Sequence, residues 1–350
     1  MMVFPGINFD KRNDRDYKRL VYEDHQKGAT SLFKLGISPT LNTPFEIMHL
    51  VYLGLTLKHL EAWINGKYGY VAKLSKLFSE ELSRRYESLK EYCPYDFARQ
   101  PRSLLKLGKL KATEFRHFLL YASSAVCKDV ITNDHLLHLR FLVIAMRTLC
   151  RNNLTDKQLL IAKTCLDAYV TFAPNLYTLA FMSYNVHSVQ HIVDDARSCG
   201  NLESISAFVY ENNMPLFKKN IRNHPKPLQQ FANRLRERQG IQHIQSNKSI
   251  SPKVSIKHRE GKIPVELTTY CYEQFKKYEG AHFCIIVDNR NNFCQLKDDH
   301  SLCKIENIFV VNDQVVVAIK KYETTEDVFE EPIRSSSVGI FKCKKLLNYM

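Results

Sequence analysis

The sequence predicts an α+β protein, with a mainly helical N-terminal part followed by a small antiparallel β domain. Before about residue 240, apolar residues recur at helical spacing over runs of about 12 to 20 residues, and after residue 263 short β-branched runs alternate with turn residues. The chain has 350 residues, of which 45% are hydrophobic and 25% charged. This composition is typical of a globular protein and excludes a disordered chain.

The helical part is expected over residues 1–238. Leucine, phenylalanine and tyrosine line one face of each predicted helix, so we assign these residues to the core. Thr155, in the sequence T-D-K-Q, is a good N-cap for the last of these helices. The predicted helices span residues 50–63, 70–89, 112–126, 133–150 and 155–172.

The β-rich part is expected over residues 263–350. Its runs of Val, Ile and Phe are separated by turn sequences such as D-N-R-N and N-D, which favour hairpins. The predicted strands span residues 283–287, 292–296, 304–311 and 314–322. No motif in this part indicates a particular chemistry, so a partner or packing module is the default interpretation.

Positive charge is concentrated between the two parts. The protein carries a net charge of +14, and residues 218–262 contain twelve Lys and Arg against two acidic residues. A polyanionic partner such as DNA is therefore expected, although a basic linker that is merely solvated remains an alternative. Residues 239–262 are poor in large apolar residues and predict a basic linker. The candidate nucleic-acid-binding residues are Lys218, Lys219, Arg222, Lys226, Arg234, Arg236 and Arg238.

The stretch 183–222 holds most of the residues that could perform chemistry. His187 and His191 are four residues apart and would share a helix face, and Asp194 and Asp195 follow one turn later. Glu211 precedes the basic residues. Carboxylates that bind Mg²⁺ beside a cationic surface suit an enzyme acting on phosphodiesters, whereas the plain alternative is a set of packed and hydrogen-bonded side chains.

Two further observations limit the cellular context. No apolar run approaches the ~18 to 20 residues of a membrane span, and the first residues lack the layout of a secretory signal. The ten cysteines are scattered without a C-x-x-C pair, which argues against a disulfide framework. We therefore expect an intracellular protein with no membrane association.

Several strings together resemble the CACTA (En/Spm-like) DNA transposases of the insect and cnidarian type. They occur in the same order as in that family and cover most of residues 30–240. The strings are F-E-I-M-H-L-V-Y-L-G (45–54), D-F-A-R-Q-P-R-S-L (96–104), K-A-T-E-F-R-H-F-L-L-Y (111–121), S-Y-N-V-H-S-V-Q-H-I-V-D-D (183–195), A-F-V-Y-E-N-N (207–213) and K-P-L-Q-Q (226–230).

The resemblance implies an RNase H-like core in which three acidic residues hold two metal ions, with a helical insertion at about 55–180. Glu46 occupies the position of the second acid, where relatives have Asp, and Glu211 matches the third. If the enzyme were active, Mg²⁺ would be its cofactor. His187 and His191 resemble half of a zinc site found in such cores, without its C-x-x-C half.

Relatives carry the first catalytic Asp before the position equivalent to residue 1, and Asp10, Asp14 and Asp16 lie in a charged, turn-like run that does not replace it. We therefore expect a transposable-element-derived, catalytically inactive, nuclear protein that binds DNA. The alternatives are a transposase subunit whose missing part is supplied elsewhere and an interaction module without a DNA role. Transposases usually dimerise, so a homo-oligomer also stays open.

Three arginines in the quoted strings receive a structural interpretation. Arg99, Arg102 and Arg116 are expected to form ion pairs that hold the helical insertion together, rather than to contact DNA.

Overall fold

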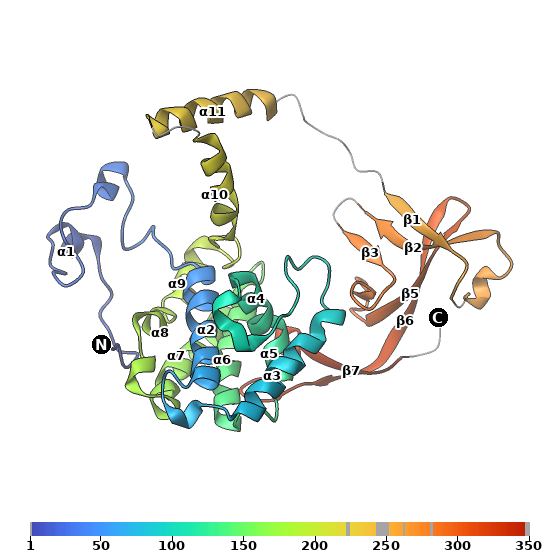
Figure 1. Ribbon diagram of the computed structural model, residues 1–350, viewed down its shortest axis with the longest axis horizontal. Coiled ribbons are helices and arrows are strands. Elements are labelled where there is room, and N and C mark those ends of the chain that lie inside the picture. The colour runs from blue at the N-terminus through green and yellow to red at the C-terminus, as the bar shows by residue number, and fades with distance from the viewer. Residues whose placement is uncertain (1, 222–224, 243–251, 262, 281–282, 347–350) are drawn as a thin grey trace. The chain divides into compact units, whose positions relative to one another are not determined.

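The computed structural model describes residues 2–221, 225–242, 252–261, 263–280 and 283–346 (Figure 1). The chain divides into two compact units. The first consists of Met1–Glu87 and Arg102–Phe208, and the second of Ser88–Pro101 and Val209–Met350. The first unit is helical and the second carries a seven-stranded antiparallel sheet. The predicted α+β class is therefore confirmed, with its helices ahead of its strands.

The first unit is built from helices and short helical turns. Among its described residues there is no β-strand, so it holds no strand of an RNase H-like sheet. Its helices are α1 (Asp14–Lys18), η2 (Met48–Thr56), α2 (Leu57–Leu60), η3 (Glu61–Asn65), α3 (Lys76–Ser88), α4 (Ala112–His117), η7 (Phe118–Ala122), α5 (Ser123–Val126), α6 (Asn133–Leu149), α7 (Asp156–Leu176), α8 (Tyr184–Ser188) and α9 (Ile192–Cys199). Its short 3₁₀ turns are η1 (Ser31–Leu35), η4 (Tyr70–Ala72), η6 (Leu104–Lys109) and η8 (Leu179–Phe181).

Four of the five helical segments predicted from apolar spacing are helical in the structure, whereas the segment 70–89 is a 3₁₀ turn at 70–72, non-helical at 73–75 and an α-helix only from Lys76. The Thr155 hydroxyl accepts the N–H of Gln158, and the Gln158 side chain accepts the N–H of Thr155, so the predicted N-cap is part of a capping box. Helices α6 and α7 pack against each other at the centre of this unit. The large side chains Trp63, Tyr86, Phe118 and Tyr169 are buried there, as the sequence predicts for core residues.

The second unit contains two helices and the sheet. Its helices are α10 (Phe208–Asn220) and α11 (Pro227–Gln242), with 3₁₀ turns at η5 (Leu89–Glu91), η9 (Val265–Leu267) and η10 (Ser335–Val338). Its strands are β1 (Lys253–His258), β2 (Tyr272–Glu279), β3 (Cys284–Ile286), β4 (Phe293–Gln295), β5 (Leu302–Val311), β6 (Gln314–Asp327) and β7 (Phe341–Leu346). The strand order is β1-β2-β5-β6-β7, with β3 on β2 and β4 on β5.

The four predicted strands correspond to β3, β4, β5 and β6, whereas β1, β2 and β7 were not predicted. β1 corrects the predicted linker at 239–262, because Lys253–His258 pairs along its length with β2. Its two apolar residues, Val254 and Ile256, alternate with polar ones, and such a short pattern is easily read as linker. The helical part also ends differently, since α11 continues to Gln242.

No helix in the part of the chain that the structure describes combines the length and the apolar character needed to cross a lipid bilayer.

Candidate functional site

The basic residues predicted to bind nucleic acid lie mainly on α10 and α11. Lys218 and Lys219 occupy the last turn of α10. The rings of Phe217 on α10 and Phe231 on α11 stack with centroids 4.4 Å apart, so the two helices are in direct contact. Lys226 lies just before α11 and adopts a positive φ of 55°, which turns the chain into that helix. Arg222 lies outside the described residues.

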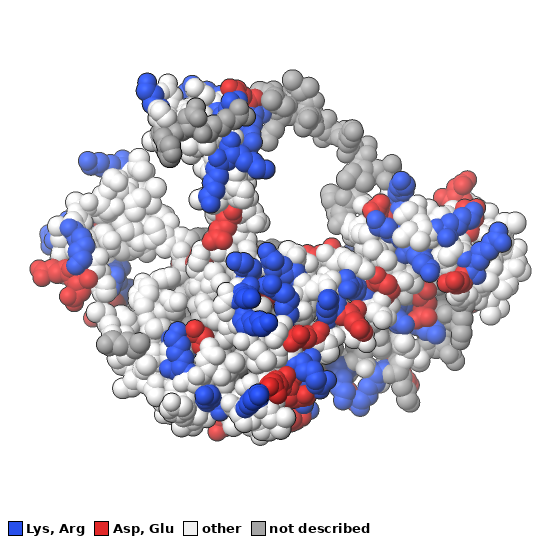
Figure 2. Space-filling model, in the orientation of Figure 1, with Lys and Arg blue, Asp and Glu red and all other residues white. Residues whose placement is uncertain are grey.

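Most of these cations face solvent without an ionic partner. Lys218, Lys219, Lys226, Arg236 and Arg238 are exposed, and none of their charged groups forms an ion pair within the described residues. Figure 2 shows Lys and Arg side chains gathered over α10 and α11. These groups are therefore free to neutralise an anionic partner.

Arg234 differs from its neighbours. It is half-buried and pairs with Glu237 one turn later, with Nη1 and Oε2 2.8 Å apart. An i,i+3 pair of this kind stabilises the helix surface by about 0.2–0.5 kcal/mol. Among the candidate residues on α11, Arg234 thus contributes less free charge than Arg236 and Arg238.

Glu46 serves as the N-terminal cap of the helix that continues through η2, α2 and η3. Its carboxylate accepts the backbone N–H groups of Met48 at 2.8 Å and His49 at 2.6 Å. A third N–H, from Ala207, reaches Oε2 at 3.0 Å. The His49 imidazole also contacts Oε1. Both oxygens are engaged in holding backbone, which does not fit the open carboxylate that a Mg²⁺ ligand requires.

Glu211, the other candidate acid, lies in the first turn of α10 and is exposed. It belongs to the second unit, whereas Glu46 belongs to the first. Within the described residues no group of three His, Cys, Asp or Glu side chains is arranged to hold a metal ion. Neither Glu46 nor Glu211 is therefore part of such a group among the described residues.

His187 and His191 face each other, although not on a single helix. A turn at residues 189–191 separates α8 from α9, and His191 precedes α9 as its N-cap residue. The two Nε2 atoms are nevertheless 3.5 Å apart. Burial lowers the pKa of both imidazoles, that of His191 to about 4, so both rings are neutral at pH 7.

The surroundings of the two imidazoles show whether they could hold a zinc ion. A separation of 3.5 Å between Nε2 atoms is compatible with one tetrahedral ion, but structural zinc takes four protein ligands. Around the pair the structure places the rings of Phe9 and Phe45, with Phe9 4.9 Å from His187 and 4.5 Å from His191. The residues present do not fit a structural zinc site, and they form an aromatic packing cluster.

Asp194 and Asp195 form hydrogen bonds with two segments that lie earlier in the chain. Asp194 accepts a hydrogen bond from Lys11, with Nζ and Oδ2 2.6 Å apart. Asp195 accepts the N–H of Phe45 at 3.0 Å, and burial raises its pKa. Both carboxylates thus bind chain elements of their own unit.

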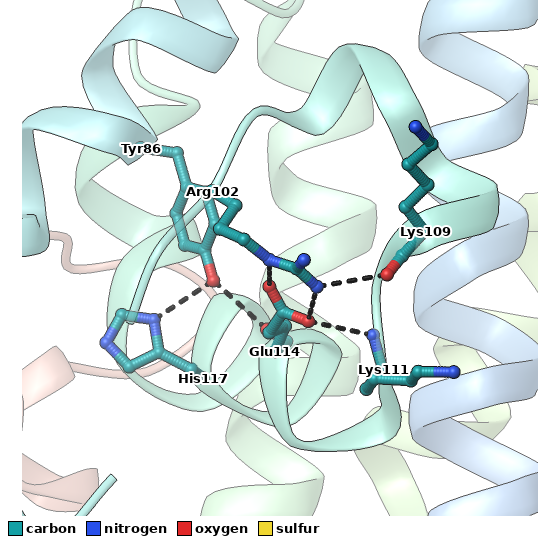
Figure 3. Close-up of polar contacts among 6 residues, drawn as sticks. All are labelled: Tyr86, Arg102, Lys109, Lys111, Glu114 and His117. Atoms are coloured by element: carbon teal, nitrogen blue, oxygen red, sulfur yellow. Dashed lines mark hydrogen bonds and ion pairs between the residues drawn. The ribbon is translucent and has the colours of Figure 1, made fainter. Parts of the chain in front are cut away.

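The predicted structural role of two arginines is confirmed. Arg102 forms a bidentate ion pair with the buried carboxylate of Glu114 (Figure 3). The Nε–Oε1 distance is 2.6 Å and the Nη2–Oε2 distance is 2.5 Å. Arg116 donates to Glu203 from Nε at 2.9 Å, and the Tyr52 hydroxyl donates to the same oxygen at 3.0 Å. Arg99 belongs to the second unit, and its predicted role stays a prediction.

Two functional candidates were missed at the sequence level. His49 contacts Glu46 from three residues along the helix, and the E-x-x-H spacing could have indicated this contact. The second is a surface of lysines on η6 and just before α4, and the leucines at every third position of L-L-K-L-G-K-L-K could have indicated it.

Comparison with known proteins gives one match. Residues 257–350 match the model of a family described as a domain of unknown function (DUF8592). This region runs from within β1 to the end of the chain and includes the rest of the sheet. Neither the curated proteins nor the solved structures contain a match to this chain.

Proposed function

We propose that this is a transposable-element-derived, nuclear protein that binds nucleic acid through α10 and α11 and does not cut it. The transposon origin rests on the resemblance of six strings to the CACTA family. The binding role rests on the unpaired cations of the two helices.

The observation that carries the proposal is the exposure of Lys218, Lys219, Arg236 and Arg238 without ion-pair partners in the described residues. Phosphate groups are the anions that such a surface neutralises best, since each contact releases condensed counterions. Lysine and arginine on helices contact the phosphate backbone without needing a particular base sequence. We therefore infer binding that is sensitive to salt and tolerant of sequence.

The absence of cleavage is supported by the use made of Glu46. A metal-binding carboxylate must offer its lone pairs to the ion, whereas those of Glu46 accept three backbone N–H groups. Mg²⁺ would supply phosphodiester activation in an active relative, but the residues here do not fit it, and no step is derived through it.

Acetylation footprinting tests the binding surface directly. A lysine-reactive ester should modify Lys218 and Lys219 in the free protein, and an excess of a 30-base-pair duplex should protect both. Lys76, which is exposed on α3 of the first unit, serves as the internal control and should stay reactive. Unchanged modification of Lys218 and Lys219 on saturation with duplex would exclude α10 as the contact.

Incubation with terminal-repeat DNA and Mg²⁺ or Mn²⁺ tests the proposal that the protein does not cut DNA. The expected result is intact DNA. Cleavage that disappears in Glu211→Ala would overturn the inactive assignment.

A further inference from the structure

A second cationic surface lies in the first unit, far along the chain from α10. The segment 103–111, which we call the lysine loop, contains the 3₁₀ turn η6 and ends at the N-terminus of α4. Residues 102–113 include four Lys and Arg and no acidic residue. The loop's cations are Lys106, Lys109 and Lys111, and all three are exposed.

Leucines at every third position fix which side of the loop faces the core. Leu104, Leu107 and Leu110 are 0%, 7% and 7% exposed. A spacing of three residues matches the 3₁₀ period, so one side of the segment is apolar and buried. The three lysines lie at other positions of the loop and are exposed.

Side-chain hydrogen bonds hold the loop at its beginning. The Ser83 hydroxyl of α3 accepts the N–H of Leu104 at 3.1 Å and lies 3.0 Å from the hydroxyl of Ser103. Ser83 also donates to Glu87 at 2.7 Å. The start of the loop is thereby fastened to α3.

The ion pair between Arg102 and the buried Glu114 holds the loop at its end. Arg102 donates from Nη2 to the carbonyl oxygen of Lys109 at 3.0 Å, and Glu114 accepts the N–H of Lys111 at 2.9 Å (Figure 3). In the same view the side chains of Lys109 and Lys111 extend away from the pair. The backbone of the two lysines is therefore fixed while their ammonium groups stay outside.

No ion pair within the described residues compensates the charges of the three ammonium groups. None of them forms a hydrogen bond or ion pair within the described residues. Glu114, on α4, is committed to Arg102, and Glu203 is committed to Arg116. Helix α2, which packs on η6, carries no carboxylate, since its sequence is L-K-H-L. Three like charges held without counter-charges favour an anionic partner.

We propose that the lysine loop is a second phosphate-contacting surface, which binds the backbone of the nucleic acid that α10 and α11 bind under the proposed function. Lysine binds phosphate as a point charge and needs no fixed hydrogen-bond geometry. Protein interfaces are centred on apolar and aromatic residues, whereas Leu105 is the single large apolar side chain of the loop that is exposed. The chemistry of the loop thus fits a phosphodiester backbone better than a protein surface.

The test compares two triple variants of the full chain. K106Q/K109Q/K111Q removes the loop charges and leaves the leucines and the Arg102–Glu114 pair in place. The matched control, K34Q/K76Q/K157Q, removes three charges from exposed lysines elsewhere in the same unit. Both variants should melt at the temperature of the wild type, because all six side chains are exposed.

Equilibrium binding to a labelled 30-base-pair duplex, as DNA and as RNA, is measured over a salt series. Loss of three phosphate contacts should weaken binding and reduce the slope of log K against log salt by about 3. The control variant should keep the wild-type slope. A loop variant that behaves like the control overturns the inference.

The outcomes separate this inference from the proposed function. If charge reversal on α10 and α11 abolishes binding while the loop variant binds normally, the proposed function stands and the lysine loop is no contact. If only the loop variant loses binding, the loop is the contact and α10 and α11 are not. If the wild type binds neither duplex at physiological salt, both fail. Binding to polyglutamate is measured as well. If the loop substitutions weaken binding to polyglutamate but not to either duplex, the partner is an acidic protein and the inference is overturned.

Discussion

The carboxylate of Glu46 accepts a hydrogen bond from the backbone N–H of Ala207, 161 residues further along the chain, at 3.0 Å. This bond joins the start of the helix at residue 48 to the turn that precedes α10. It places Glu46 in the framework of the first unit, where its carboxylate has a structural role.

Replacing Glu46 should therefore affect stability. Glu46→Ala removes a helix cap and leaves the N–H of Ala207 without this acceptor, so we expect the free energy of unfolding to fall by about 1–2 kcal/mol in urea denaturation. His49→Ala, which keeps the carboxylate, is the control and should cost less. A Glu46→Ala variant as stable as the wild type would show that the cap contributes nothing.

The Arg102–Glu114 pair should respond differently to removal of each partner. Glu114 is 1% exposed and Arg102 is 47% exposed. Arg102→Met leaves a buried carboxylate without its cation and should cost about 3–5 kcal/mol. Glu114→Gln leaves a guanidinium that water can reach and should cost about 1 kcal/mol. Thermal or urea unfolding of the two variants checks this order, and the reverse order would contradict the assigned burial.

Gly54 permits a close approach between η2 and α8. A Cβ at this position would lie 2.7 Å from the side-chain nitrogen Nδ2 of Asn185 and 2.8 Å from the backbone carbonyl oxygen of His49. Because the His49 oxygen belongs to the backbone, Gly54→Ala should destabilise the protein by about 1–3 kcal/mol. Gly28→Ala is the control, since a Cβ there meets no atom within 4 Å. Equal melting temperatures for both variants would refute the contact.

Buried histidines should make the first unit sensitive to acid. The two ring nitrogens of His59 are hydrogen-bonded to the hydroxyls of Tyr177 and Tyr169. His138 is hydrogen-bonded through Nε2 to the carbonyl oxygen of Tyr169. Burial lowers the pKa of His59 well below its usual value and that of His138 to about 3. Both are neutral in the fold and take up protons near pH 6.5 when unfolded.

The sign of the effect follows from proton uptake. Between pH 6.5 and about 3 the unfolded chain binds more protons, so the free energy of unfolding falls as the pH is lowered, by roughly 1.4 kcal/mol per pH unit for each such histidine. Denaturation at pH 7, 6 and 5 measures this slope. His138→Met should reduce it, whereas His25→Gln, at an exposed position, should not. A stability independent of pH over this range would contradict the neutral assignment.

The sequence predicts the long helices α6 and α7 because each has a long apolar face, and it predicts β5 and β6 because their β-branched runs are continuous. It misses β1, β2 and β7, whose apolar residues are few and are separated by polar or charged residues. Pairing with a neighbouring strand, which local pattern does not reveal, creates these strands.

The candidate site shows the same limit. The basic residues of α10 and α11 were visible as a run of charge. The cap made by Glu46 was not, because its partner Ala207 is distant in sequence. The break between α8 and α9 was also hidden, since His187 and His191 keep the four-residue spacing of a helix.

The most direct test of the account is the salt dependence of duplex binding. The wild type is compared with K218E/K219E/R236E/R238E at 50 and 200 mM salt, using a labelled 30-base-pair duplex and the matching single strand. We predict that the wild type binds both, that its affinity falls steeply with salt, and that the variant loses binding. Equal binding by the two proteins, or a wild-type affinity that does not change with salt, would contradict the assignment of α10 and α11 as a nucleic-acid surface.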